Sequence, residues 1–320
     1  MRTISITIIL AASLFILPSL SSSRSPGELL TTGHVDEALQ FLEQQVRQAP
    51  NDAGSHNMLC RTYFMMEDWD RGISSCERAR DLDPKNSLNY LWLGRIYGEK
   101  ASRVNFLAAA GLAKKVRTAF ERAVELDPDS WEARADLGEF YLEAPSIVGG
   151  GKDKARSQAN ALMPLKPVKA FWLLGRISEK DKDFADAERQ YRAGIAATHS
   201  GTRAWVELAI FYRHNSRLDD MEKALRELEN AQVDDHLALM DGASLLVRTG
   251  RDPQLGIRLL RRYFSVGTVE GGPAFRAHEY WGQLLERQGD HRGAAQEYHA
   301  ALQLYHNYRH AQEGLRRVEH

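Results

Sequence analysis

The chain has 320 residues, of which 43% are apolar, so it can bury either one large core or a series of small ones. Its 42 Lys and Arg residues balance 43 Asp and Glu residues, which leaves a formal net charge of −1 at pH 7. This balance provides no overall field that would attract nucleic acid, and we therefore expect no nucleic-acid partner.

Residues 1–23 have the composition of a secretory signal peptide. Arg2 precedes an almost entirely apolar run, Ile4 to Leu17, which Pro18 and a Ser-rich stretch follow. We expect cleavage and a periplasmic or secreted location. The alternative is an uncleaved anchor, because residues 3–23 carry no charge and are just long enough to span a bilayer. Contact with a membrane is expected only in that second case.

Residues 24–52 predict a degenerate first half-repeat. Glu28 to Thr32 reads as a short helix, and Gly33 marks a turn into a second helix that Pro50 ends. The second helix carries apolar residues at helical spacing, namely Ala38, Leu39, Leu42 and Val46. Its missing partner would overlap the signal peptide, so we expect the N-terminal end of the array to be poorly capped.

The stretch from 119 to 142, AFERAVELDPDSWEARADLGEFYL, contains a pattern that the rest of the chain repeats. An apolar helix ends at Pro128, which lacks a backbone donor and clashes with the preceding turn. The next helix places a bulky residue, a glycine and an aromatic residue on one face, at Leu137, Gly138 and Tyr141. This arrangement resembles the tetratricopeptide repeat (TPR), whose period is about 34 residues.

The resemblance covers nearly all of residues 34–320 and implies an all-α fold, a right-handed α-α superhelix of about eight helical hairpins with a C-terminal capping helix. After the half-repeat, the expected solenoid (53–307) divides at 53–86, 87–130, 131–167, 168–201, 202–235, 236–273 and 274–307, and the capping helix follows at 308–320. The third unit has about ten extra residues, and its Ala-rich part (106–112) is expected to lengthen the helices. A second insert, at 144–151, has no role that the sequence reveals.

In TPR proteins the first helices of the hairpins line an inner groove in which peptides lie. The resemblance therefore implies a peptide-binding groove, and the matching positions are Arg61, Phe64, Arg95, Trp172, Arg176 and Arg213. Three arginines in register with an aromatic residue would suit an acidic or carboxylate-ended peptide. The alternative is an ordinary solvated face, with salt bridges from these arginines to Glu99 and Glu143.

Cys60 and Cys76 fall on the two helices of one predicted hairpin. In an oxidising compartment they can form a disulfide, which would stabilise the fold by roughly 3 kcal/mol in the entropy model. The alternative is two buried free thiols, because each cysteine stands where the repeat takes a small or medium apolar residue. Two cysteines offer too few ligands for a metal site.

No pattern in the sequence predicts catalysis, a cofactor or a metal. The run from Gly149 to Lys152 lacks the first glycine, the hydroxyl residue and the preceding strand of a phosphate-binding loop, and we interpret it as a turn between helices. His306 and His310 are four residues apart, but a turn is expected between them. Paired acids such as Asp234 and Asp235 are interpreted as helix caps.

These observations favour an exported, non-catalytic scaffold of a bacterial type that binds a peptide segment or partner protein in its concave groove. An alternative is a structural subunit of an envelope or secretion assembly, which contacts its partners through the edges of the solenoid or its N-terminal end. An exposed apolar strip at 35–46 would favour that alternative. A third hypothesis is small-molecule binding between the two units that carry inserts.

Overall fold

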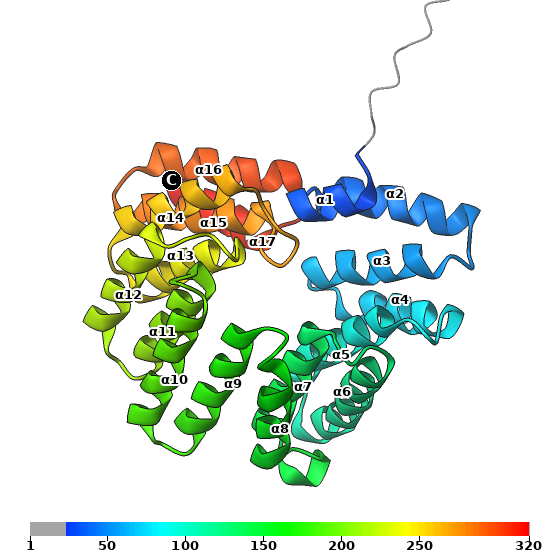
Figure 1. Cartoon of the computed structure of the whole chain (residues 1–320). Helices are drawn as coiled ribbons and strands as arrows, with labels where there is room; N and C mark the ends of the chain where they lie inside the picture. The colour runs from blue at the N-terminus through cyan, green and yellow to red at the C-terminus, as the bar shows by residue number, and fades with distance from the viewer. Residues whose placement is uncertain (1–23, 320) are drawn as a thin grey trace, which may run out of the picture.

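The computed structural model describes residues 24–319, and within that range the chain forms seventeen α-helices and one short 3-10 helix. The helices pair in chain order into eight hairpins, and a single helix follows the last of them (Figure 1). The predicted all-α solenoid of about eight hairpins with a C-terminal helix is confirmed. The signal-peptide prediction concerns residues 1–23 and lies outside the described residues.

Odd-numbered helices open the hairpins and even-numbered helices close them. The first four hairpins are α1 (Pro26–Thr32) with α2 (Val35–Gln48), α3 (Ala53–Met65) with α4 (Trp69–Leu82), α5 (Ser87–Ala101) with α6 (Phe106–Leu126), and α7 (Trp131–Glu143) with α8 (Lys152–Leu162). The last four are α9 (Pro167–Lys180) with α10 (Phe184–Ala197), α11 (Thr202–His214) with α12 (Leu218–Asn230), α13 (Leu237–Thr249) with α14 (Pro253–Val266), and α15 (Ala274–Arg287) with α16 (His291–Leu304). The last helix is α17 (Arg309–Val318).

The turns inside the hairpins share one backbone geometry. In four hairpins a single residue with positive φ separates the end of the first helix from the N-cap of the second; these residues are Glu67, Lys182, Ser216 and Gly289, with φ of 59°, 60°, 58° and 76°. Only glycine adopts this conformation without a steric cost. Because the same geometry recurs at equivalent positions, the repeat itself explains the positive φ of Glu67.

Both inserts are ordered. The first lengthens α6, which runs for 21 residues from Phe106, as the Ala-rich composition predicted. The second forms a 3-10 turn, Ser146–Val148, that packs against α6, where Arg117 Nη1 donates a hydrogen bond to the carbonyl of Val148 at 3.2 Å. A Cβ at Gly150 would collide with the carbonyl oxygen of Ala144, so this turn requires glycine.

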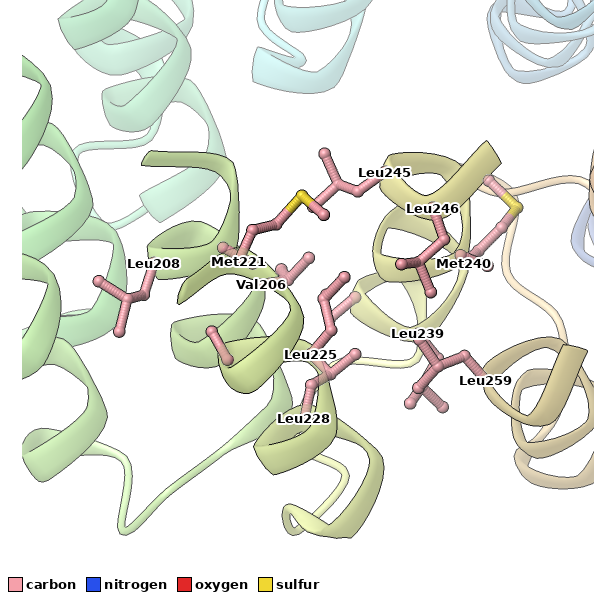
Figure 2. Packing of buried hydrophobic residues seen from close by; sticks show 14 of the residues in the cluster. Val206, Leu208, Met221, Leu225, Leu228, Leu239, Met240, Leu245, Leu246 and Leu259 are labelled. Carbon is pink, nitrogen blue, oxygen red and sulfur yellow. The ribbon is translucent and has the colours of Figure 1, made fainter. Parts of the chain in front are cut away.

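Apolar side chains between successive hairpins form a nearly continuous core. Figure 2 shows part of the largest cluster, in which Leu225 of α12 packs between α11 and α13, and Leu239 of α13 faces Leu259 of α14. All three leucines are fully buried, which stabilises the fold by about 1.5–3 kcal/mol for each side chain. No hairpin buries its own apolar face, so stability depends on stacking.

A disulfide joins Cys60 of α3 to Cys76 of α4, with their Cα atoms 5.1 Å apart. Both side chains are fully buried in the cluster between the second and third hairpins. Of the two alternatives that the sequence left open, the structure therefore contains the bonded one. The bond fixes the two helices of one hairpin to each other.

The solenoid closes on itself. In Figure 1, α1 (blue) lies beside the C-terminal helices α16 and α17 (red), so the first and last hairpins meet. Leu29, Leu30 and Val35 share one buried cluster with Phe275 and Tyr305, from the other end of the chain. The closure interface, as we call this N-terminal to C-terminal contact, leaves Leu30 and Val35 with no exposed surface.

Polar contacts reinforce the closure interface. The hydroxyl of Thr268 donates to the carbonyl of Thr31 at 2.9 Å, and Asp36 Oδ2 accepts from the backbone N–H of His306 at 2.7 Å. Arg61 of α3 donates from Nε to Glu270 Oε1 at 2.7 Å and forms a second, shorter contact with the same carboxylate.

The prediction of a poorly capped N-terminal end is therefore wrong. The short α1 and the start of α2 are covered by the last hairpin and α17 instead of by a preceding repeat, whereas Leu42 of α2 packs against Leu59 and Tyr63 of α3. Val35, Ala38 and Leu42 are fully buried. Helical periodicity identified this apolar face correctly, but it carries no information on what covers it.

Candidate functional site

From α3 to α15 the odd-numbered helices form the inner wall of the closed solenoid, and the even-numbered helices from α4 to α16 lie outside them (Figure 1). Consecutive odd-numbered helices from α3 to α5 and from α7 to α15 contact each other directly. Their inward positions carry the charged and aromatic side chains from which the sequence predicted a groove.

Between α5 and α13, ion pairs along the inner wall connect each odd-numbered helix to the next. From α5 to α13 the pairs are Arg95 with Asp136 at 2.6 Å, Arg176 with Glu139 at 3.7 Å, Lys169 with Glu207 at 3.4 Å, and Arg203 with Asp241 at 3.0 Å. We call this series the ion-pair ladder. Because basic residues face acidic ones in the next repeat, the wall has no row of uncompensated positive charge.

Three of the four predicted groove arginines therefore already have an acidic partner. Arg61 pairs with Glu270, Arg95 with Asp136, and Arg176 most closely with Glu143, at 2.7 Å. The salt bridge to Glu143 is one that the solvated-face alternative named, whereas Glu99 pairs with a different arginine. None of the three arginines is more than 28% exposed, so all of them are held against the wall.

The remaining predicted groove residues contribute mainly to packing. Phe64 contacts Trp92 edge to face, with ring centroids 5.5 Å apart, and Trp172 packs against the two largest apolar clusters. Arg213 of α11 is half-buried, and its Nε has no hydrogen-bond partner within residues 24–319. The structure thus places all six predicted residues on first helices of hairpins, as the resemblance implied.

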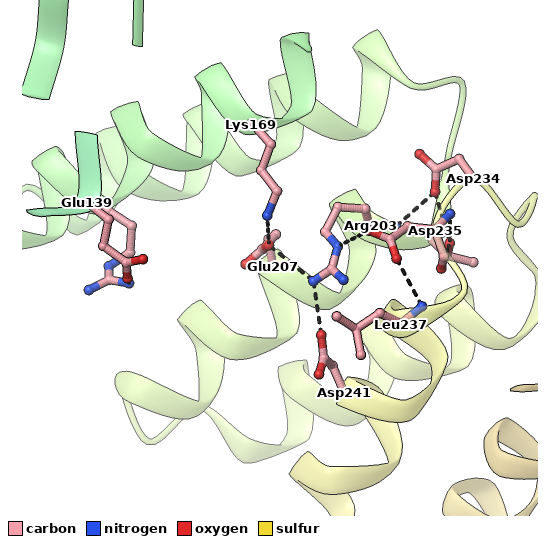
Figure 3. Close-up of polar contacts among 10 residues, drawn as sticks. Glu139, Lys169, Arg203, Glu207, Asp234, Asp235, Leu237 and Asp241 are labelled. Carbon is pink, nitrogen blue, oxygen red and sulfur yellow. Dashed lines mark hydrogen bonds and ion pairs between the residues drawn. The ribbon is translucent and has the colours of Figure 1, made fainter. Parts of the chain in front are cut away.

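Sequence reasoning missed the most buried charge cluster, which is centred on Arg203 (Figure 3). Arg203 is only 6% exposed, and its guanidinium contacts the carboxylates of Asp235, Asp241 and Glu207 at 2.8, 3.0 and 3.4 Å. Asp235 does accept from the backbone N–H of Leu237 at 2.9 Å, as a cap would. Its second oxygen, however, binds the arginine of the preceding repeat.

The carboxyl groups in this cluster titrate differently. Burial opposes ionisation of Asp235, but the charge and hydrogen bond of Arg203 outweigh burial and hold the pKa of Asp235 below its ordinary value. Burial raises the pKa of Asp241 and also that of Glu139, although Arg203 and Arg176, respectively, oppose the change. Burial therefore favours the neutral form of Asp241 and of Glu139.

A cleft lies where the N-terminal and C-terminal parts meet. Its inner chamber has a volume of about 210 Å³ between the α3–α4 turn, α5 and the α14–α15 loop, and an outer chamber of about 350 Å³ continues towards the turn before α17. The rings of Phe64, Trp69 and Trp92 form one wall, with centroid distances of 5.6 and 5.5 Å from Phe64 to the two indoles. We call these two chambers the closure cleft.

The other groups that the sequence singled out form turns and salt bridges that belong to the fold. Gly149 and Gly150 form the turn described above, and Lys152 pairs with Asp181. His306 lies in the turn before α17, where its Nδ1 contacts Asp36 at 2.8 Å.

Within residues 24–319, no group of three or more His, Cys, Asp and Glu side chains is arranged to hold a metal ion. None of the helices in that range is both long and apolar enough to cross a membrane.

Comparison with known proteins supports tetratricopeptide repeats in the C-terminal part of the chain. The tetratricopeptide repeat family model matches residues 168–235 and 240–309. Superkiller complex protein 3 of Mus musculus is 23% identical over 62% of this chain, and the match spans only 12% of that relative's length.

Two solved structures are also similar. Yeast Tom70 matches with a TM-score of 0.56 and 15% identity over 95% of this chain and 65% of that chain. A thermophilic TPR protein of Thermus thermophilus matches with a TM-score of 0.49 and 16% identity over 58% of this chain and 96% of that one. At these identities the likeness to Tom70 concerns the fold alone.

Proposed function

Because the chain folds as a solenoid of tetratricopeptide repeats, we propose that it is an exported, non-catalytic scaffold that binds a partner protein or peptide segment on its inner wall. Stacked helical repeats of this class form extended concave surfaces that these proteins use for binding. The composition of residues 1–23 supports export to the periplasm or outside the cell.

The observation that carries this proposal is the fixed arrangement of charged side chains along the inner wall. Each ladder arginine is held by an acid of the adjacent helix, so it need not be ordered when a partner binds. Arg95 donates a hydrogen bond to Asp136 through Nε alone, whereas a guanidinium has five N–H groups. The remaining N–H groups can donate hydrogen bonds to a carboxylate of an acidic partner without breaking the existing pair.

Affinity capture from the native envelope extract tests the proposal. An Arg61→Ala, Arg95→Ala, Arg176→Ala variant should lose partners that the wild type retains, after circular dichroism shows that it folds. Since Arg61 also holds the closure interface, the Arg95→Ala, Arg176→Ala variant is run beside it.

The matched control removes three arginines that are exposed elsewhere: Arg47, Arg189 and Arg309, which are 69%, 72% and 79% exposed. This control has the same change in charge and should keep all partners. Identical partners in every variant would overturn recognition by the inner-wall arginines.

Export needs a separate measurement, because no described residue bears on it. The full chain is expressed in a bacterial host with an envelope, and the intact mass of the fractionated protein is determined. Loss of about the first 23 residues, with recovery outside the cytoplasm, is expected. A full-length mass in the membrane fraction would indicate the uncleaved anchor, and full-length protein in the cytoplasm would contradict export.

The alternative role, a structural subunit of a larger assembly, now depends on different residues. The strip at 35–46 is largely covered, which removes the feature that would have favoured contact through the N-terminal end. The two inserts, however, carry the most exposed large apolar side chains: Phe106, Leu107 and Ile147 are 81%, 83% and 85% exposed. A triple Ser variant at these positions, taken through the same capture, separates contact through the solenoid edge from contact through the inner wall.

A further inference from the structure

The closure cleft contains two carboxylates whose hydrogen-bonding capacity is unused. Glu67, in the α3–α4 turn, and Glu99, on α5, line the inner chamber, and each is 43% exposed. Within residues 24–319 neither carboxylate accepts a hydrogen bond, and their ion pairs with arginines are long, at 3.7 Å. Of the other acids named on the inner wall, Glu139 alone has an ion pair as long as these, at 3.7 Å to Arg176.

Arg103, which follows α5, occupies the space between these acids. It is the partner of both Glu67 and Glu99 at 3.7 Å, and its guanidinium carbon lies 4.8 Å from the ring centroid of Trp69. Arg103 donates no side-chain hydrogen bond within the described residues, and its side chain is 47% exposed. It therefore sits over an aromatic face, between two acids, without being fixed there.

The charges of the inner chamber favour a cation once Arg103 moves away. The carboxylates of Glu67, Glu99 and Glu270 line the chamber, and the only other arginine lining it is Arg276. Glu270 is already engaged by Arg61. A planar guanidinium can stack on the Trp69 indole and donate hydrogen bonds to two carboxylates at once, which a carboxylate or an apolar side chain cannot do.

We propose that the closure cleft binds an arginine side chain of a partner protein, and that Arg103 is an internal competitor occupying the same cage of Glu67, Glu99 and Trp69. This inference deepens the scaffold function and rests on it, because it assigns the partner a basic residue at this point. The three cage residues belong to the N-terminal part, and Glu270, Pro273 and Arg276 of the C-terminal part line the same chamber, so an occupant lies between the two parts.

Short peptides test the cage without any need for the natural partner. The probe is an acetylated, amidated Gly-Arg-Gly peptide, and binding to the full chain is measured by calorimetry and by tryptophan fluorescence. The matched control peptide carries citrulline, which has nearly the same shape as arginine without the charge. A lysine peptide distinguishes a guanidinium site from a general cation site.

Two variants report on the cage itself. Arg103→Gln removes the competitor and should tighten binding of the arginine peptide at least about fivefold, because the binding-competent fraction rises. Glu67→Gln with Glu99→Gln in the same chain should weaken it by at least about tenfold, since hydrogen bonds to charged acceptors are lost. Arg189→Gln, which removes an exposed arginine of α10 outside the closure cleft, is the matched control and should change the affinity little.

Equal binding of the arginine and citrulline peptides, or unchanged affinity in Arg103→Gln, would overturn the proposal. Tighter binding of the lysine peptide than of the arginine peptide would also do so. Small-angle scattering of each variant shows whether the ring remains closed. The peptide experiment does not use the natural partner. A negative peptide result therefore leaves the inner-wall proposal standing, and a negative capture result does not change the outcome of the peptide experiment.

Discussion

Gly138 and Gly98 both lie inside first helices of hairpins, but a methyl group would meet different surroundings at each. A Cβ at Gly138 would collide with Leu173 of the next repeat, whose side chain is fully buried and has little room to move. A Cβ at Gly98 has no neighbour within 4 Å. The same substitution should therefore have opposite effects at these two residues.

We expect Gly138→Ala to destabilise the protein by about 1–3 kcal/mol through overpacking. Gly98→Ala should stabilise it by up to about 1 kcal/mol, because alanine restricts the unfolded chain and favours the helix. Urea unfolding of the two variants and the wild type measures both changes. Equal effects of the two substitutions would show that interhelical contact at Gly138 is not the reason for glycine there.

Asp235 and Asp241 both contact Arg203, yet their pKa values shift in opposite directions. The lowered pKa of Asp235 stabilises the fold above about pH 3.9, and this stabilisation is lost as the pH falls towards the folded-state pKa. The raised pKa of Asp241 stabilises the fold below about pH 3.9, and that contribution is lost as the pH rises through the folded-state pKa.

The Asp235→Asn and Asp241→Asn variants should therefore show opposite pH trends relative to the wild type. The destabilisation caused by Asp235→Asn, about 1–2 kcal/mol at neutral pH, should shrink as the pH falls below about 4. That caused by Asp241→Asn should be largest in acid and shrink as the pH rises. Urea unfolding across this pH range measures both, and parallel trends would mean that the Arg203 cluster does not control these carboxyl groups.

At the scale of single residues, the sequence predicted positions better than it predicted partners. The repeat register placed Arg95 and Arg176 on the inner wall correctly, because the register depends on local spacing. Their ion pairs depend on which acid stands on the adjacent helix, at sequence separations near the length of a repeat. Arg203 was missed for the same reason, although Asp235 lies 32 residues further along the chain.

Among the elements, α3 and α4 are the pair with a covalent link. Reducing the Cys60–Cys76 bond should lower the free energy of unfolding by roughly 3 kcal/mol, because the loop of 16 residues no longer constrains the unfolded chain. Thermal unfolding with and without a thiol reductant measures this loss. A Cys60→Ala, Cys76→Ala variant is the control, and it should be insensitive to the reductant; an equal response of both proteins would refute the assignment.

The hairpins themselves could be predicted because each depends on contacts between neighbours. Pro128 ends α6 two residues before Ser130, whose hydroxyl accepts from the N–H of Ala133 at 3.2 Å and caps α7. Signals of this kind lie within a few residues of the boundary that they set. The conformation of the second insert was harder to predict, since its turn depends on the distant Arg117.

For the whole molecule, the closure interface should be necessary for the compact shape. Leu30→Asp places a carboxylate in a fully buried site between the two ends of the chain. We expect α1 to detach, the radius of gyration to increase, and stability to fall by at least about 2–5 kcal/mol, the usual effect of losing a buried leucine.

Small-angle scattering and urea unfolding measure these effects. Leu107→Asp is the matched control, because Leu107 is 83% exposed and the same substitution there should change stability by no more than about 0.5 kcal/mol. An unchanged radius of gyration in Leu30→Asp would show that the ring does not depend on this contact.

Closure could not be predicted from the sequence. The apolar stripe of α2 was evident, but a stripe specifies a face and does not specify the surface that covers it. Thr31 and Thr268 are 237 residues apart, and whether they meet depends on small rotations accumulated over every intervening hairpin. The closure cleft went unpredicted for the same reason, since Trp69 and Glu270 become neighbours only in the closed ring.

An open repeat array has two terminal units, each with a neighbour on one side only, and it can fray from either of them. In this protein the first and last hairpins cover each other, so every hairpin has a neighbour on both sides. No terminal hairpin can therefore detach at a small cost in free energy, and unfolding must begin by breaking an interface between neighbouring hairpins or the closure interface. A solenoid of this kind behaves as a loop of mutually dependent units, in which adding or removing a single hairpin would prevent the ends from meeting.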